Sequence, residues 1–215
     1  MDKMQGVLVF DQHSQGYDRW FDEHEALYQS EVNALRRFVP HSGCGIEIGV
    51  GTGRFSVPFG IRLGVEPSRA MAHIVHERGI AVCQAMGEEL PFRDNQFDFA
   101  LLVTVICFVD SVPVLLQEVQ RVLKPGGQII TGFIDRNSVL GQLYESRKAH
   151  DKFYRAARFY AVAEVAECFQ QVGCGALRFC QTIFGLQGES PTVEAIREGY
   201  GEGAFVVTSA EKHRS

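Results

Sequence analysis

The sequence predicts an α/β fold built on a mostly parallel sheet with helices on both faces. Segments typical of strands and of helices alternate along the chain. The strand segments lack internal polar positions, as expected of strands that are buried on both faces. The last two strand segments have no helical pattern between them, so they are expected to form an antiparallel hairpin at one edge. With 215 residues, the chain fits a single domain over residues 1–215.

Seven short apolar segments are predicted as strands. They span residues 45–50, 61–65, 80–85, 97–105, 128–134, 176–184 and 203–209. The first ends in glycines, which is typical of a buried strand, and the fourth is continuously apolar after Asp98. Together these segments predict a seven-stranded sheet.

Four segments are predicted as helices. They span residues 17–38, 68–79, 112–123 and 161–171. Ser68 is suited to cap the second of these helices, and Gly79 is suited to end it. The run Lys-Pro-Gly-Gly at 124–127 closes the third, because proline and glycine do not continue a helix.

Two connections depart from this regular alternation. The link at 54–60 is short, whereas a parallel crossover normally takes a dozen or more residues, usually a helix. Since Pro58 also interferes with a helix there, the first helix is predicted to be short or vestigial, with that side of the sheet thinly covered. The stretch 135–160 is long, polar and aromatic, which predicts a cap facing the substrate. Residues 1–40 are predicted to form an N-terminal helical lid.

Composition narrows the class of protein. The net charge is −5 and no basic tract is present, so nucleic acid is disfavoured as a partner. The first residues show no signal-peptide pattern, and the apolar run 7–10 is too short to span a membrane, so a soluble, cytoplasmic protein is expected. The six cysteines include no C-x-x-C pair, and His73 and His76 have no evident partner ligand. No disulfide framework or metal site is therefore predicted.

Glycines alternate at the carboxyl end of the first predicted strand, where ligands bind in open α/β sheets. Residues 47–53 read Glu-Ile-Gly-Val-Gly-Thr-Gly. Glycines permit a tight turn and let a ligand approach the backbone closely. Glu66, at the end of the next strand, can accept hydrogen bonds from both hydroxyls of a ribose. The combination predicts a cofactor that contains a nucleoside; a tight turn without a ligand is the alternative.

The spacing of the glycines separates two such cofactors. A dinucleotide site needs Gly-x-Gly-x-x-Gly or Ala, and Arg54 stands at the third of these positions, where its bulk would disturb close helix packing. The run is Gly-x-Gly-x-Gly instead, and no Gly-x-x-x-x-Gly-Lys phosphate loop is present. S-adenosylmethionine (SAM) carries no phosphate and does not need a helix N-terminus. The spacing therefore favours SAM over NAD.

Four stretches of the sequence resemble a known family. They are GIEIGVGTGRF, LGVEPSRAM, GEELPFRDNQFDFALL and EVQRVLKPGGQII, and the resemblance covers roughly residues 43–133. On these stretches the chain is similar to the class I SAM-dependent methyltransferases of the type 11 group. The resemblance implies a Rossmann-like sheet, SAM as cofactor and methyl transfer as the activity. It leaves the acceptor open, since the group methylates many small molecules.

The resemblance also implies which residues contact the cofactor. These residues are Glu47, Gly49, Gly51, Gly53, Glu66, Pro67, Met71, Gly87, Glu88 and Thr104. The three glycines of the first run would lie beside the methionine and ribose of SAM. Glu47 would order their loop, and Glu66 would hold the ribose hydroxyls.

The remaining implied contacts surround the adenine and the transferred group. Pro67 and Met71 would line the adenine pocket, and the pair 87–88 would meet the adenine edge. Many relatives place an aspartate where this chain has Met86, so either Glu88 substitutes for it or backbone groups alone recognise adenine. The segment 104–106, which includes Ile106, would border both the cofactor and the substrate.

Further candidate substrate contacts lie outside the glycine run. Tyr17, Trp20 and Tyr28 fall on one broad stripe of the first predicted helix and would cover SAM and its acceptor. Ordinary packing of an amphipathic helix on the sheet is the alternative. Tyr144 and Tyr154 belong to the insertion at 135–160, whose mixture of charge and aromatic surface suits a small amine or an aromatic substrate. A solvated loop is the alternative there.

The predicted activity is transfer of a methyl group from SAM to a small-molecule acceptor, with release of S-adenosylhomocysteine (SAH). The cofactor supplies the electrophile, so the protein mainly has to place the nucleophile and exclude water. A general base is needed only when the nucleophile must lose a proton, and the sequence identifies no catalytic residue. The alternative is a SAM- or SAH-binding regulator or partner subunit without turnover. The expected assembly is a monomer or a homodimer.

Overall fold

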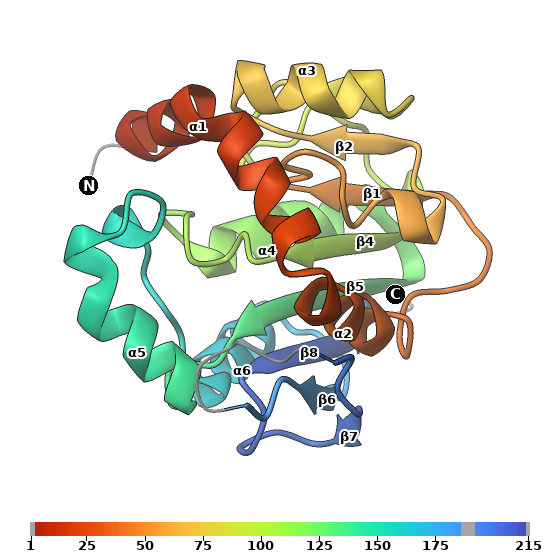
Figure 1. Cartoon of the computed structure of the whole chain (residues 1–215). Helices are drawn as coiled ribbons and strands as arrows, with labels where there is room; N and C mark the ends of the chain where they lie inside the picture. The colour runs from red at the N-terminus through yellow and green to blue at the C-terminus, as the bar shows by residue number, and fades with distance from the viewer. Residues whose placement is uncertain (1–2, 186–191, 214–215) are drawn as a thin grey trace.

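One sheet of eight strands forms the centre of the protein (Figure 1). The computed structural model describes residues 3–185 and 192–213. The strands are β1 (Gly45–Ile48), β2 (Leu63–Val65), β3 (Ala81–Cys83), β4 (Phe97–Val103), β5 (Leu123–Ile134), β6 (Arg178–Thr182), β7 (Arg197–Glu198) and β8 (Phe205–Glu211). Their order is β3-β2-β1-β4-β5-β8-β6-β7. The predicted α/β fold is confirmed, and the short β7 adds an eighth strand to the seven that were predicted.

The five strands from β3 to β5 are parallel, and the pairings that involve β8, β6 and β7 are antiparallel. The predicted antiparallel pair at the edge is therefore confirmed as β6 and β8. The order of strands reverses at β1, which pairs with β2 on one side and with β4 on the other. In open α/β sheets the crevice at such a reversal, beyond the carboxyl ends of the strands, is where ligands bind.

Helices cover both faces of the sheet, as predicted. On one face, α4 (Val112–Val122) and α6 (Val162–Gln171) bury their apolar side chains against β1 and β4. On the other face, α2 (Glu25–Leu35) and the end of α1 (Lys3–Glu23) pack over β4, β5 and β8. The helix α3 (Arg69–Glu77) lies beside β3, and Ser68 caps it by accepting a hydrogen bond from Met71 N, as the sequence predicted.

The first crossover helix is vestigial, as predicted. The link between β1 and β2 holds only the short 3₁₀ helix η1 (Val57–Phe59), which ends at Gly60 with a φ of +66°. The expectation that this side of the sheet is thinly covered was wrong. The ring of Phe55 packs against Phe21 of α1 and Tyr28 of α2, at centroid distances of 5.7 and 5.5 Å. The N-terminal helices thus fill the place of the missing helix.

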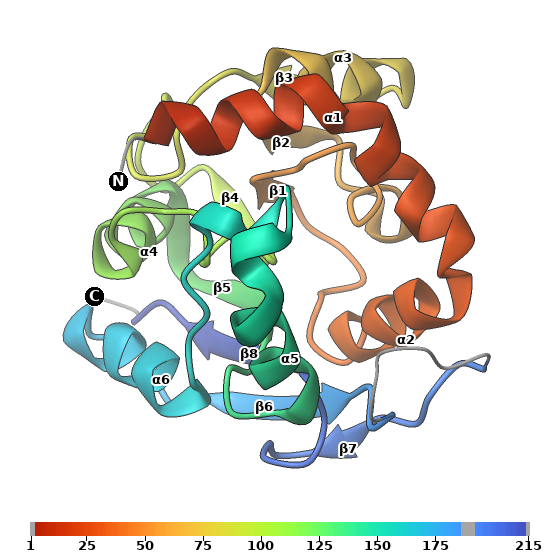
Figure 2. The same cartoon turned by 60° about the vertical axis from the view of Figure 1, so that its left-hand side comes forward.

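The helix α1 begins at Lys3, well before the predicted start at residue 17. Its backbone leaves the helical region at His13, where φ is −125° and ψ is 17°, and Figure 2 shows the bend that follows. Gly6 and Gly16 lower the helix propensity of the first half, which explains why the sequence pattern missed it. Asp11 holds this half against α3, since its Oδ1 accepts from Ala70 N and from the Ser68 hydroxyl at 2.9 and 2.6 Å.

The stretch 135–160 is largely helical rather than a loop. It contains α5 (Val139–Arg147) and the 3₁₀ turns η2 (Lys148–His150) and η3 (Tyr154–Ala156). It returns to the sheet at Tyr160, which forms a bridge with Asp135. Figures 1 and 2 show α5 beyond the carboxyl ends of the strands, on the same side as the first half of α1.

Candidate active site

A pocket lies at the carboxyl ends of β1, β2 and β4, at the point where the strand order reverses. Most of the predicted cofactor residues line it: Gly49, Gly51, Glu66, Pro67, Met71, Gly87, Glu88 and Thr104. Tyr17, a predicted substrate contact, lines the same pocket. Glu47 and Gly53 do not line it.

The sequence analysis missed two groups of lining residues. The first half of α1 contributes Gly6, Val7 and Phe10, and the segment after β4 contributes Phe108 and Val109 in addition to the predicted residues 104 and 105. Phe10 packs edge-on against Phe108, with ring centroids 5.1 Å apart, so the two groups meet across the pocket. The sequence did contain a signal for the first group. The apolar run at residues 7–10 belongs to none of the predicted strands or helices, so its side chains had no assigned place in the core.

The three glycines of the loop after β1 have different structural reasons. All three have positive φ, at +68° for Gly49, +56° for Gly51 and +84° for Gly53. A Cβ on Gly49 would lie 2.3 Å from Val105 Cγ2, and one on Gly53 would lie 3.0 Å from Ile80 Cδ1, so these two glycines serve close packing. Within 4 Å of the corresponding point on Gly51 lies only Tyr17 Cε1, at 3.8 Å. Gly51 is therefore the glycine whose open side borders the pocket.

Glu66 connects the loop after β1 to the start of α3. Its Oε2 accepts from Gly51 N and its Oε1 from Ser68 N, both at 2.9 Å. Burial raises the pKa of Glu66 to about 7, and these two backbone hydrogen bonds limit the rise. The carboxyl group thus fixes the shape of the glycine loop and also borders the pocket.

Glu47 lies beneath the loop, in the buried end of β1. The Ser56 hydroxyl donates to its Oε2, so Glu47 ties β1 to the vestigial crossover. Burial raises the pKa of Glu47 to about 8; the hydrogen bond from Ser56 opposes this rise and the charge of Glu66 adds to it. The placement agrees with a role in ordering the loop and gives no direct access to the pocket.

The far wall of the pocket is mostly apolar. It is formed by Pro67, the buried Met71, and Met86 at the position where many relatives carry an aspartate. Glu88 lines this wall, and its Oε1 accepts from Asp110 N at 3.0 Å. A Cβ on Gly87 would lie 2.6 Å from Leu115 Cδ1, so this glycine allows the loop to sit against α4.

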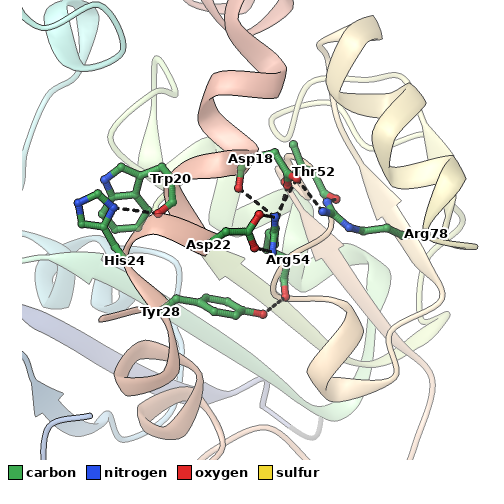
Figure 3. A network of polar contacts seen from close by, with 8 residues as sticks. All are labelled: Asp18, Trp20, Asp22, His24, Tyr28, Thr52, Arg54 and Arg78. Carbon is green, nitrogen blue, oxygen red and sulfur yellow. Dashed lines mark hydrogen bonds and ion pairs between the residues drawn. The ribbon is translucent and has the colours of Figure 1, made fainter. Parts of the chain in front are cut away.

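A network of charged side chains holds α1 over the glycine loop (Figure 3). The Arg54 guanidinium binds both carboxylate oxygens of Asp18 at 2.9 Å and both of Asp22 at 2.6 and 2.8 Å. Arg78 also binds Asp18, at 2.8 Å, and donates to the backbone oxygen of Thr52. Burial acts to raise the pKa of Asp18, but the hydrogen bonds from Arg54 and Arg78 outweigh it and hold that pKa well below its ordinary value.

This network gives Arg54 a structural role that the sequence analysis did not predict. The link that follows the glycine loop holds the short η1 in place of a full crossover helix, and the Arg54 side chain points toward α1 (Figure 3). The sequence signal was the pair Asp18 and Asp22, which lie four residues apart on one face of a helix. Sequence alone could not show that their partner lies in the glycine loop.

Four of the predicted substrate contacts lie in two places, two on the N-terminal helices and two in the insertion. Trp20 stacks on His24, with ring centroids 4.5 Å apart, and Tyr28 donates its hydroxyl to the Arg54 backbone oxygen at 2.6 Å (Figure 3). Neither lines the pocket. Tyr144 and Tyr154 stack on one another at 5.1 Å.

A second, small cavity adjoins the first. It is lined by Thr104, Ile106, Cys107, Phe133, Ile134, Tyr154, Phe159 and Tyr160. Two of the predicted substrate contacts, Ile106 and Tyr154, therefore line a common space. Thr104 lines both cavities.

The buried carboxyl groups predict how stability depends on pH. Burial raises the pKa of Glu31 and Glu47 to about 8 and that of Glu66 to about 7, all above the ordinary value of 4.5. The folded state therefore binds protons more tightly than the unfolded state, so this contribution to stability is full below pH 4.5 and is lost as the pH rises toward 8. The melting temperature of the free protein is expected to fall over this range in scanning calorimetry. A rising or flat profile would contradict the burial of these groups.

Three further findings concern the described residues as a whole. Over residues 3–185 and 192–213, no group of three or more His, Cys, Asp or Glu side chains is placed to hold a metal ion. The six cysteines carry free thiols. No helix in the described ranges has the length and apolar character needed to cross a membrane.

Comparison with known proteins agrees with this architecture. A family model described as a methyltransferase domain, of the type 11 group, matches residues 46–131. An uncharacterised protein of Methanocaldococcus jannaschii is 50% identical over 204 residues, which cover 95% of this chain and 98% of that protein. An uncharacterised protein of Mycobacterium tuberculosis is 34% identical over 200 residues, which cover 90% of this chain and 70% of that protein.

A solved structure from Thermotoga maritima is similar over nearly the whole length. It is described as a SAM-dependent methyltransferase and a possible histamine N-methyltransferase. It is 44% identical, with a TM-score of 0.93, and the match covers 96% of this chain and 99% of that one.

The sheet order, the glycine loop and the carboxylate after β2 define the class I methyltransferase fold. The chain belongs to the SAM-dependent methyltransferases, within the type 11 group.

Proposed function

We propose that this enzyme methylates a small-molecule acceptor. The supporting observation is that two segments meet over the pocket. Phe153 of the insertion stacks on Phe10 of α1 with ring centroids 5.5 Å apart and packs edge-on against Tyr17 at 5.6 Å. An acceptor that reaches the end of β4 must fit beneath these rings. This arrangement favours a small molecule over a protein or a nucleic acid.

The residues of the pocket fit SAM. Glu66 offers a carboxylate that can accept from the ribose hydroxyls, and the open side of Gly51 allows close approach to the backbone. Pro67 and Met71 provide an apolar surface for adenine. We assign Gly49, Gly51, Glu66, Pro67 and Met71 to the cofactor on these grounds.

A Gly51→Val exchange tests this assignment. A β-branched side chain at a φ of +56° is strained, which is expected to cost about 1–2 kcal/mol of folding free energy. Its methyl groups would also project toward the pocket, so SAH affinity is expected to fall by at least about tenfold in calorimetry. Gly60→Val is the matched control, because Gly60 has a similar φ of +66° and no atom within 4 Å. If both variants bind SAH like the wild type, Gly51 does not border the cofactor.

The chemistry needs little from the protein beyond placement. When bound, SAM supplies a methyl group on a positively charged sulfur; methyl transfer breaks that carbon–sulfur bond and leaves the electron pair on SAH. The chain's own residues hold the acceptor in line and exclude water. Phe10, Tyr17 and Phe153 form the water-excluding cover in this proposal.

A SAM- or SAH-binding regulator without turnover is the competing function. Such a protein needs the cofactor pocket but no space for an acceptor. The lining of the pocket extends to Phe10, Phe108 and Val109, beyond the residues assigned to the cofactor, and this additional apolar surface favours turnover.

Binding and turnover separate these functions. SAM and SAH are expected to raise the melting temperature of the purified protein, whereas NAD is expected to leave it unchanged. With labelled SAM and a pool of small metabolites, a labelled product distinct from SAM is expected. Stabilisation by NAD alone would contradict the cofactor assignment. Tight SAM binding without any labelled product would favour the regulator.

A further inference from the structure

The helix α2 carries a buried carboxyl group for which the described residues provide no partner. Glu31 is only 6% exposed, and across residues 3–185 and 192–213 no hydrogen bond or ion pair involves its carboxyl group. Its neighbour Ser30 shows the usual behaviour of a buried polar group: it donates to Ala26 O at 2.7 Å and accepts from Glu194 N at 2.9 Å. Burying a polar group without a partner costs free energy of folding. A function of Glu31 would explain why the protein keeps a carboxyl group at this position.

The surroundings of Glu31 are aromatic and lack a positive charge. Burial alone raises the pKa of Glu31, and no cation among the described groups opposes it. Its charge acts on four tyrosines: Tyr17, Tyr28, Tyr144 and Tyr154. The helix around it packs in one apolar cluster with the rings of Tyr17, Tyr28 and Tyr144. An apolar residue would suit this position better if only packing mattered.

The position of these tyrosines relates Glu31 to the reaction site. Tyr17 lines the cofactor pocket, and Tyr154 lines the second cavity. Thr104 lines both. Glu31 thus lies near the aromatic wall that separates the cofactor from the insertion, where an acceptor has to sit.

We propose that Glu31 binds the protonated nitrogen of the acceptor, and that the acceptor is a small primary or secondary amine. This inference rests on the proposed function of the same site. An ammonium group supplies the positive charge that no described residue places beside this buried carboxyl group. It is also attracted to the faces of tyrosine rings, such as those of Tyr17, Tyr28 and Tyr144, which pack in the same cluster as α2. A neutral hydroxyl acceptor supplies no such charge.

The same carboxylate accounts for the proton balance. An ammonium nitrogen has no free electron pair, so it must lose a proton before it can take a methyl group. Glu31 accepts that proton, the nitrogen forms the new bond to the methyl carbon, and the carbon–sulfur bond breaks. The methylated ammonium product leaves, and Glu31 returns its proton to the solvent. One proton is released for each methyl group transferred.

Binding to matched pairs of compounds tests the assignment without requiring turnover. The full chain, saturated with SAH, is titrated in a calorimeter with histamine, tyramine and phenethylamine. It is also titrated with the three corresponding alcohols, in which a hydroxyl group replaces the amino group. At least one amine is expected to bind about tenfold more tightly than its alcohol. Glu31→Gln is expected to remove that preference. Glu25→Gln, an exposed change on the same helix, is expected to keep it.

Stability distinguishes a binding role from a structural one. Glu31→Gln and Glu31→Leu are expected to melt at or above the temperature of the wild type, because each removes a buried acid for which residues 3–185 and 192–213 provide no partner. SAH affinity is expected to stay unchanged in both. A large fall in melting temperature with an intact preference for amines would show that Glu31 is structural.

The outcomes also separate this inference from the proposed function. If no amine binds more tightly than its alcohol, or if Glu31→Gln keeps the preference, the amine assignment fails. If SAM binds and only neutral compounds gain a methyl group, the proposed function stands and the amine assignment fails. If SAM and SAH do not bind at all, both fail.

Discussion

Replacing Glu66 with alanine is expected to weaken SAM and SAH binding by about 1–3 kcal/mol, which corresponds to a loss of roughly fivefold to 150-fold in affinity. Two effects add together. The ribose hydroxyls lose their acceptor, and the Gly51 and Ser68 amides lose the carboxylate oxygens that they bind at 2.9 Å. The second effect disorders the loop that the cofactor approaches. Calorimetry with SAH measures the change.

The Glu66→Gln variant separates the two effects. The amide keeps the size of the side chain and one good acceptor, so one of the two backbone hydrogen bonds can remain. Its affinity is therefore expected to lie between those of the wild type and the alanine variant. Equal affinity in all three proteins would contradict both effects, the contact with the ribose and the ordering of the loop for binding.

Arg54→Ala is expected to lower the free energy of unfolding by about 2–3 kcal/mol, between the values typical of exposed and buried ion pairs. The Arg54 side chain is 18% exposed and binds two carboxylates. Its loss leaves Asp22 without this partner and leaves Asp18 with Arg78. Because the network joins α1 to the glycine loop, SAH affinity should fall as well. Urea unfolding and hydrogen exchange of α1 measure the two effects.

The sign of the pH dependence provides an internal check on Arg54→Ala. The pKa of Asp18 is lowered in the folded state, so its contribution to stability is present above its ordinary value of 3.8 and is lost as the pH falls below it. The difference in stability between wild type and variant should therefore shrink in acid. Arg19→Ala, an exposed change on the same helix, is the control and should leave stability nearly unchanged. A constant difference down to low pH would mean that Arg54 acts through packing alone.

The sheet and its cofactor loop were predictable because their signals are local. Buried parallel strands are continuous apolar runs, and the turns that follow them need glycine at positive φ, as at Gly49 and Gly51. The vestigial first helix was predictable for the same reason, since Pro58 and the length of the link depend only on nearby residues. The start of α1 was not, because its apolar residues cover a pocket and its two glycines weaken the helical pattern.

What the sequence determined by itself is the fold class, the family and the loop that approaches the cofactor, because each follows from the order of residues within short segments. Only the tertiary structure decided what surrounds that loop. It brought Arg54 together with Asp18 and Asp22. It also buried Glu31, which has no hydrogen-bond partner among the described residues, on a helix that packs with tyrosine rings from α1, α2 and α5. The physical reason is that burial and charge pairing depend on residues far apart in the chain. A carboxylate on a helix looks solvent-exposed in sequence until the fold shows what covers it.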